Sequence, residues 1–216
     1  ENYDVAPPPG RTALIGLPPK DAVYVYNQND LGLWARIESP HPEYRVGISG
    51  VGHSVAIDGD LVAALDWYED KYNQLPNAAY VFRKTVGEWA QISTLECCIG
   101  FGEVMIEGNT IAVSSVDPVG VIFLYIYDEK DNSLVPIQEP LSHESVIWTM
   151  SLSDNHIVCT TGDGNMWTGP YGDIDRVFVY QRQDTSQPFT LLQYFNSSDY
   201  DDGFGRELTL DNGLLD

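Results

Sequence analysis

Four short segments of the chain alternate aliphatic and aromatic residues, and this alternation predicts β-strands. β-Branched and aromatic side chains favour strands, and a period of two places the aromatic side chains on one face and the aliphatic ones on the other. Because both faces are apolar, each strand must be covered on both sides, as a central strand is. The segments recur every 45 to 56 residues and are Val23–Tyr26, Ala79–Phe82, Leu124–Tyr127 and Val177–Tyr180. This alignment makes four aromatic residues equivalent: Tyr24, Tyr80, Tyr125 and Phe178.

Further apolar runs flank each copy and predict two hairpins per repeat. Upstream, the turns Asp58–Asp60 and Glu107–Asn109 each join two apolar runs, and such glycine turns are the strongest short-range hairpin signal. Downstream, a strand containing Trp34 or Trp89 follows a polar turn. In the third copy this strand contains Pro136, which cannot donate to a sheet ladder and therefore indicates an edge strand. No segment has a capped 3.6-residue apolar period, so we expect essentially no helix.

Four antiparallel strands repeated about every 50 residues favour an all-β fold, a β-propeller of four-stranded blades. A β-sandwich is the alternative, but a sandwich has no reason to repeat its sequence. Since the chain holds about four blades, we expect part of a larger propeller of about seven blades rather than a closed four-bladed ring. The expected parts are an N-terminal tail (1–10), a partial blade (11–45), three blades (46–97, 98–143 and 144–198) and the start of a further blade (199–216).

Several motifs follow one another in the same order along the chain. Val51–Asp60 reads Val-Gly-His-Ser-Val-Ala-Ile-Asp-Gly-Asp, Tyr80–Trp89 completes that unit, and Phe101-Gly102 and Phe204-Gly205 open two others. Over roughly residues 11 to 216 these motifs resemble the FG-GAP repeat, the blade unit of integrin α-chain heads and of many bacterial and algal surface proteins. The resemblance implies an extracellular or cell-surface propeller. Integrin-type blades often carry calcium loops, but the turns here are too short to supply the roughly six to eight oxygens that calcium needs.

The composition indicates a folded, strongly acidic protein. The 216 residues are 43% hydrophobic and 12% aromatic, which supports a core and argues against intrinsic disorder. The formal net charge of −21 excludes nucleic acid as a partner, because a polyanion would be repelled. No run of about 18 apolar residues predicts a membrane span. Residues 1–10 carry no apolar segment of the signal-peptide kind, so any signal peptide is already gone or lies outside this chain.

Cysteine, histidine and the one glycosylation sequon add little chemistry. Cys97 and Cys98 are adjacent and Cys159 stands alone, so two interpretations stay open: buried small hydrophobic residues, or a disulfide between Cys159 and one of the pair. Asn196-Ser197-Ser198 is a glycosylation sequon, and Asn196 its acceptor. The histidines lie far apart in the sequence, so we expect no metal site among them. They are His41, His53, His143 and His156.

Two loops mix aromatic residues with carboxylates and are the candidate binding sites. Residues 66–77 and 161–175 both connect the second and third strands of a blade, so we expect them on the same face of the propeller. Such a mixture suits sugar stacking, protein contacts or loosely held calcium, and ordinary solvated loops are the alternative. The candidate residues are Asp66, Trp67, Tyr68, Asp70, Asp163, Asn165, Trp167, Tyr171, Asp173 and Asp175.

The chain contains no nucleophile elbow and no zinc-protease motif, so we predict no catalytic residue and no enzyme. The FG-GAP resemblance implies a non-catalytic protein whose partners are other proteins or glycans, or which builds a homo-oligomer or larger structure. We expect no cofactor beyond loosely bound calcium. The alternative is an enzyme acting on polysaccharide, which needs two carboxylates about 5 to 10 Å apart, or a propeller module attached to a catalytic domain outside this chain.

Overall fold

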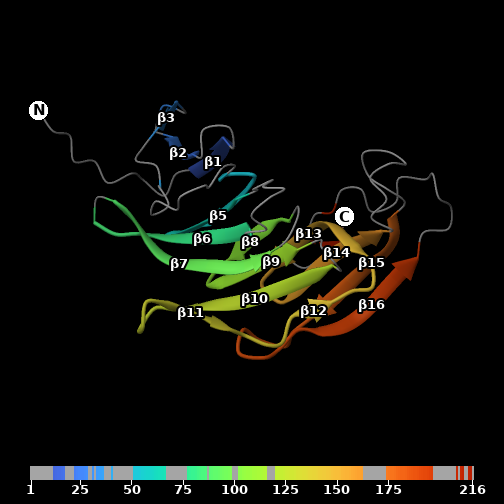
Figure 1. The fold of residues 1–216 in the computed structure, drawn as a ribbon. Coiled ribbons are helices and arrows are strands. Elements are labelled where there is room, and N and C mark those ends of the chain that lie inside the picture. Colours follow the sequence, from blue (N-terminus) through green and yellow to red (C-terminus); the bar gives the residue numbers. More distant parts are fainter. Residues whose placement is uncertain are drawn as a thin grey trace, which may run out of the picture.

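A computed structural model of the chain contains β-strands and no helix in the part that it describes (Figure 1). The predicted all-β class is therefore confirmed, and none of the described residues forms a helix long and apolar enough to cross a membrane. The described residues are 12–17, 22–28, 31, 33–36, 40, 51–66, 77–86, 88–98, 102–115, 120–162, 174–196, 208, 210–211 and 214–215.

The strands form antiparallel sheets that follow one another along the chain. The first sheet holds β1 (Thr12–Leu17), β2 (Ala22–Gln28) and β3 (Trp34–Arg36). The second holds β4 (Ser54–Asp58), β5 (Leu61–Leu65), β6 (Asn77–Lys84) and β7 (Trp89–Cys98). The third holds β8 (Val104–Glu107), β9 (Thr110–Ser115), β10 (Val121–Asp128), β11 (Ser133–Pro136) and β12 (Leu141–Ser142). The fourth holds β13 (Val146–Ser153), β14 (His156–Gly162), β15 (Ile174–Gln181) and β16 (Thr190–Asn196). A last hairpin pairs β17 (Leu210–Asp211) with β18 (Leu214–Leu215).

Neighbouring sheets meet face to face, with their innermost strands side by side. β4 lies against β8, β8 against β13, and β13 against β17. Within the second and fourth sheets the strands are hydrogen-bonded in chain order, so consecutive connections alternate between the two ends of the strands. This order places the β4–β5 and β8–β9 turns at one end of the sheets and the β5–β6 connection at the other.

The second sheet has an apolar core on both faces, as the alternating pattern predicts. On β6, Tyr80 and Phe82 pack toward Val23 of the first sheet, whereas Ala79 and Val81 pack toward Ile111 of the third. These six side chains are at most 1% exposed. Burying apolar surface contributes about 25 cal/mol per Å², so the faces between sheets are the main source of stability. The predicted burial of the aromatic strand on both sides is therefore confirmed.

The third sheet corrects the alignment of the repeats by two residues. Counted from the turn glycines Gly59 and Gly108, Tyr125 pairs with Ile111 as Phe82 pairs with Val62. Tyr125 is therefore the equivalent of Phe82, and the predicted equivalence with Tyr80 is wrong. The reason is that β10 carries three alternating aliphatic–aromatic pairs, Ile122–Tyr127, so the pattern fits in two registers. A shift of two residues keeps every side chain on its face, so the packing is unaffected.

Two local expectations about the sheets are confirmed. Pro136 ends β11, which is an edge strand of the third sheet. Gly59 and Gly108 occupy the hairpin turns with φ of 52° and 55°, a conformation that favours glycine. A third glycine has a different role: a Cβ at Gly102 would lie 2.1 Å from the Ser114 carbonyl oxygen. Gly102 thus lets the chain entering β8 approach β9 closely.

Candidate functional site

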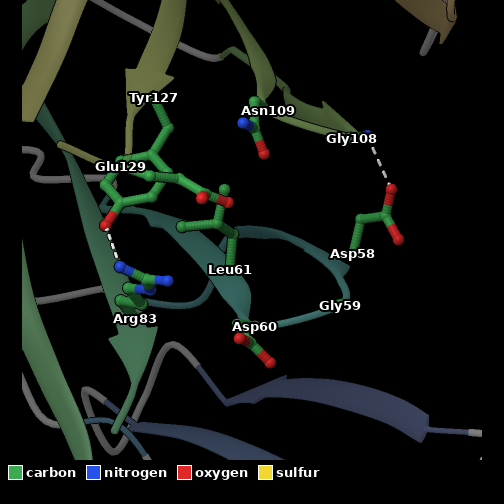
Figure 2. Close-up of a pocket in the computed structure, with 9 residues that line it drawn as sticks. All are labelled: Asp58, Gly59, Asp60, Leu61, Arg83, Gly108, Asn109, Tyr127 and Glu129. Carbon is green, nitrogen blue, oxygen red and sulfur yellow. Dashed lines mark hydrogen bonds between the residues drawn. The ribbon is translucent and has the colours of Figure 1, made fainter. Parts of the chain in front are cut away.

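A polar cavity of about 310 Å³ opens between the second and third sheets, at the end where the β4–β5 and β8–β9 turns lie. We call it the intersheet cavity. It is bounded by both turns, by the end of β6 and by the turn after β10. Its lining residues, shown in Figure 2, are Asp58, Gly59, Asp60, Leu61, Arg83, Gly108, Asn109, Tyr127 and Glu129.

The two hairpin turns are joined directly across the cavity. The backbone N–H of Gly108 donates a 2.6 Å hydrogen bond to Oδ2 of Asp58 (Figure 2). Each turn is short because its glycine adopts positive φ, so both ends of the bond are held by tight hairpins. The bond therefore fixes the distance between the two walls of the intersheet cavity.

Arg83 and Tyr127 form the second link between the sheets. Nη1 of Arg83 donates a 2.5 Å hydrogen bond to the Tyr127 hydroxyl, and the Tyr127 hydroxyl donates to Oδ1 of Asn132 at 2.7 Å. The guanidinium carbon of Arg83 also lies 5.1 Å from the centre of the Tyr127 ring, within cation–π distance. Tyr127 is buried, so the positive charge of Arg83 is held in place at the cavity wall.

The remaining polar groups of the cavity are available to a ligand. Asp60 and Glu129 are exposed, and no described side chain bonds their carboxylates. In Figure 2 the side chains of Asn109 and Glu129 point into the space between the two turns and Tyr127. A carboxylate can accept a proton or a hydroxyl hydrogen bond, and a guanidinium can stabilise a developing oxyanion. The arrangement can therefore bind a polyhydroxylated molecule and polarise it.

Further carboxylates surround the turns that border the cavity. The pKa of Glu107, at the end of β8, is raised, first by partial burial and then by the charges of Asp58 and Asp154. Asp154 lies in the β13–β14 turn, so these three carboxylates come from three successive sheets. Negative charge is therefore concentrated at these three inner turns, with the guanidinium of Arg182 bonded to the backbone of the third.

Of the binding residues predicted from the sequence, Asp66 is the one whose side chain the structure describes. Asp66 is 3% exposed; its Oδ1 accepts the Ala78 N–H at 2.5 Å, and its Oδ2 accepts the Tyr80 hydroxyl at 3.3 Å. Asp66 therefore ties the start of the β5–β6 connection to β6. Asp175 belongs to β15, but its side chain lies outside the description. The others lie outside the described residues: Trp67, Tyr68, Asp70, Asp163, Asn165, Trp167, Tyr171 and Asp173.

The intersheet cavity lies at the end of β5 and β6 opposite to Asp66, the first of the predicted binding residues. The sequence interpretation assigned Asp58–Asp60 and Glu107–Asn109 to hairpin turns and Tyr127 to an aromatic strand, with no functional role for any of them. The sequence signal that could have found them is the recurrence of acidic glycine turns in neighbouring blades. Adjacent blades place equivalent turns side by side, so two such turns share one surface.

Sequence reasoning also missed a buried cluster around His143. Its Nε2 lies 3.3 Å from the Tyr180 hydroxyl and 3.6 Å from Sγ of Cys159, and its ring packs on Phe178 at 4.6 Å between ring centres. Burial lowers the pKa of His143 to about 4 and raises the pKa of Cys159 to about 12. Burial also raises the pKa of Tyr180, with a smaller contribution from Cys159. At neutral pH all three groups are uncharged, so the cluster is packed structure and not an activated thiol.

Two sequence expectations bear on metals and disulfides. Cys159 is a free and buried thiol, which favours the interpretation as a small hydrophobic residue over a disulfide. The side chains of Cys97 and Cys98 lie outside the description. Within the described ranges, no three or more histidine, cysteine or acidic side chains are grouped as a metal ion would need. The expectations about cofactors and calcium stay predictions.

Comparison with known proteins identifies similar folds. No family model and no curated protein sequence matches the chain. A structure of a Lactobacillus plantarum protein matches with a TM-score of 0.61 and 14% identity over 93% of this chain. A Bacteroides fragilis protein, provisionally named a 6-phosphogluconolactonase, matches with a TM-score of 0.58 and 13% identity over 93%. A periplasmic gluconolactonase of Pseudomonas aeruginosa gives a TM-score of 0.45 and 13% identity over 92% of this chain and 72% of its own.

The first two matches establish the fold as β-propeller-like. This chain spans 57% and 58% of the length of those two structures. The predicted β-propeller class is thus confirmed, whereas the number of blades stays a prediction. So do the predicted blade boundaries.

The FG-GAP, integrin-like identification is wrong, because no family model matches and a similar propeller structure is provisionally named a 6-phosphogluconolactonase. Alternating strands and acidic glycine turns are needed by any four-stranded antiparallel blade, so they do not distinguish one propeller family from another. The expectation of a non-catalytic protein, which accompanied the FG-GAP identification, is wrong as well. That expectation depended on the resemblance and on the missing catalytic motifs, and one of the structures with a similar fold is provisionally named a 6-phosphogluconolactonase.

Proposed function

We propose that this chain is the propeller of a lactonase-like hydrolase, in which the intersheet cavity binds a sugar lactone and promotes its opening by water. The observation that carries the proposal is the gathering of carboxylates, a guanidinium, an amide and a phenol around one cavity of about 310 Å³. That volume is at the lower end of the usual range for ligand sites and suits a single sugar ring. The likeness of the fold to a propeller named as a lactonase adds support.

The proposed division of roles follows from the position of each group. Asn109 and Asp60 line the cavity with groups that hydrogen-bond sugar hydroxyls. Leu61 supplies an apolar surface against the C–H face of the ring. Arg83 lies at the cavity wall, where its hydrogen bond to Tyr127 positions the guanidinium, and we assign it the role of stabilising the oxyanion. Glu129 points into the cavity and is the candidate general base (Figure 2).

In the proposed reaction Glu129 takes a proton from a water molecule whose oxygen attacks the carbonyl carbon of the lactone. The carbonyl oxygen becomes an oxyanion, which Arg83 stabilises. Collapse of this tetrahedral species breaks the bond between the carbonyl carbon and the ring oxygen. The ring oxygen then receives the proton from Glu129 and becomes a hydroxyl, and the product is the hydroxy acid. General base catalysis of this kind contributes typically about 10²- to 10⁴-fold.

The test measures acid release from glucono-δ-lactone by the purified protein, in weak buffer with a pH indicator. We expect a rate above spontaneous hydrolysis that saturates with substrate. Glu129→Gln should lower kcat by about 10²-fold or more, and Arg83→Gln by a similar factor, since each removes one catalytic contribution. Asp184→Asn, in the β15–β16 turn of another sheet, is the matched control. A rate no greater than that of buffer, or full activity in both cavity variants, would refute the proposal.

A second candidate is glycoside hydrolysis, because several carboxylates line the same cavity. Retaining and inverting glycosidases both use two carboxyl groups that flank the scissile bond. A panel of nitrophenyl glycosides separates the candidates. Glycoside hydrolysis is favoured if the parent protein releases nitrophenol and both Asp60→Asn and Glu129→Gln do not. The lactonase is favoured if the parent protein opens the lactone but releases no nitrophenol.

We further propose a location outside the cytoplasm. The support is Asn196, which is exposed at the end of β16 and begins the sequon Asn196-Ser197-Ser198. Asparagine-linked glycan attaches to such exposed sites in secreted proteins. Mass spectrometry of the native protein tests this: a hexosamine-bearing peptide at Asn196 is expected, and a fully unmodified peptide would count against secretion through a glycosylating pathway.

A further inference from the structure

The intersheet cavity carries more negative than positive charge. Asp58, Asp60 and Glu129 each contribute a carboxylate, and Arg83 contributes the one cation among the lining residues. Arg83 is already bonded to Tyr127 and lies against its ring. The cavity lining therefore has a formal charge of −2 at neutral pH.

Two carboxylates just outside the lining add negative charge. Glu107 and Asp154 lie at the adjacent inner turns, and Glu107 interacts electrostatically with both Asp58 and Asp154. The guanidinium of Arg182 interacts with Asp154 and donates hydrogen bonds to its backbone carbonyl oxygen. Lys130 follows Glu129 in its turn but does not line the cavity, and its backbone N–H bonds Asp128. The chain as a whole has a formal charge of −21. A ligand that enters the cavity thus approaches through a negative potential.

Phosphate groups are held in proteins by features that this cavity lacks. Paired arginine or lysine side chains and the N–H groups of a helix N-terminus are the usual partners of a phosphoryl dianion. The described residues form no helix, and the single guanidinium of the lining faces three carboxylates. A phosphate ester bound here would bring two more negative charges into the same space.

We infer that the intersheet cavity takes neutral, unphosphorylated sugar lactones and discriminates against their phosphate esters. This inference rests on the proposed function and narrows it. The groups that select the substrate are Asp58, Asp60 and Glu129, which accept hydrogen bonds from neutral hydroxyls and repel anions. Glu107 adds to the repulsion from outside the cavity.

The experiment compares kcat/KM for glucono-δ-lactone and for its 6-phosphate ester at ionic strengths of about 0.02 M and 0.5 M. We expect the neutral lactone to be preferred by about tenfold or more at low salt, and the preference to shrink at high salt as the charges are screened. Equal or faster hydrolysis of the phosphate ester at low salt would overturn the inference and leave the lactonase proposal standing. Failure to hydrolyse either lactone would refute the lactonase proposal, and the inference with it.

A pair of charge variants tests the cause of the preference. Glu107→Gln removes a negative charge near the cavity without altering its lining, and should raise kcat/KM for the phosphate ester about two- to threefold at low salt, with the neutral lactone unchanged. Glu144→Gln is the control. It removes the same charge from an exposed residue just before β13, at the end of that strand opposite to Asp154, and should leave kcat/KM for both substrates unchanged. If Glu107→Gln changed kcat/KM for both substrates by the same factor, the electrostatic origin of the preference would be contradicted.

Discussion

Arg83 donates a hydrogen bond to the hydroxyl of Tyr127 from one sheet to the next, and its guanidinium carbon lies 5.1 Å from the centre of that ring. Arg83 lies near the end of β6, the aromatic strand of the second sheet, and Tyr127 belongs to β10, the equivalent strand of the third. The pair therefore depends on the packing of two repeats against each other. It also places the one cation of the intersheet cavity at a defined position on the wall.

Tyr127→Phe tests whether this pairing positions Arg83 for lactone opening. The variant keeps the ring beneath the guanidinium but removes the acceptor oxygen. We expect kcat/KM for glucono-δ-lactone to fall about tenfold, equivalent to about 1.4 kcal/mol, near the value of a hydrogen bond to a charged group. Tyr194→Phe, at an exposed position on β16, is the matched control and should change neither activity nor stability. An unchanged kcat/KM in Tyr127→Phe would show that the ring alone suffices.

The lowered pKa of His143 predicts that the protein loses stability in mild acid. Its pKa is about 4 in the folded chain, against about 6.5 when it is exposed, so the unfolded state binds the proton more readily. The contribution of the neutral imidazole to the free energy of unfolding is fully present above pH 6.5. It is lost as the pH falls toward 4, and the loss is at most about 3 kcal/mol.

Urea unfolding of the parent protein and His143→Gln at pH 7 and pH 4.5 measures this effect. The variant is expected to be less stable at pH 7, because the packing on Phe178 and the contact with Tyr180 are lost. Its free energy of unfolding should nevertheless fall less between the two pH values. The same pH dependence in both proteins would contradict the assignment to His143.

Asp66 is predicted to act in stability. Asp66→Ala leaves the Ala78 N–H and the Tyr80 hydroxyl buried without this acceptor, and each lost bond to a buried donor costs about 1 to 3 kcal/mol. We expect the free energy of unfolding to fall by about 2 to 5 kcal/mol. Tyr80→Phe removes one of the two donors and should cost less. A stable Asp66→Ala protein that had lost ligand binding would instead support the role predicted from the sequence.

Gly102 and Gly108 are expected to tolerate alanine to different degrees. A Cβ at Gly102 would lie 2.1 Å from the Ser114 carbonyl oxygen, so the backbone must move. Overpacking of this kind costs about 1 to 3 kcal/mol. Gly108 has open space around it, and alanine there is disfavoured by its φ of 55° alone, at a cost of about 1 kcal/mol. Thermal unfolding of both variants compares the costs, and equal stability of Gly102→Ala and the parent would contradict the close approach.

Local rules determined much of the fold from the sequence. The alternation in Ala79–Phe82 predicted a strand covered on both faces, and its side chains pack on both neighbouring sheets. The turns at Gly59 and Gly108 were predicted from their glycines, since positive φ is a local requirement. Pro136 was expected at a sheet edge for an equally local reason, its missing N–H. In each case the cause lies within a few residues of its effect.

The candidate site and the relation to known families were decided only by the tertiary structure. Asp58 and Gly108 are 50 residues apart, and Arg83 and Tyr127 are 44 apart; the packing of successive sheets brings each pair together. Alternation and turns are shared by all antiparallel blades, so they predicted a propeller but misassigned its family and its activity. The sequence pattern thus determined which strands form and which faces they bury. The chemistry of the intersheet cavity arises where two repeats meet, and neither repeat contains it alone.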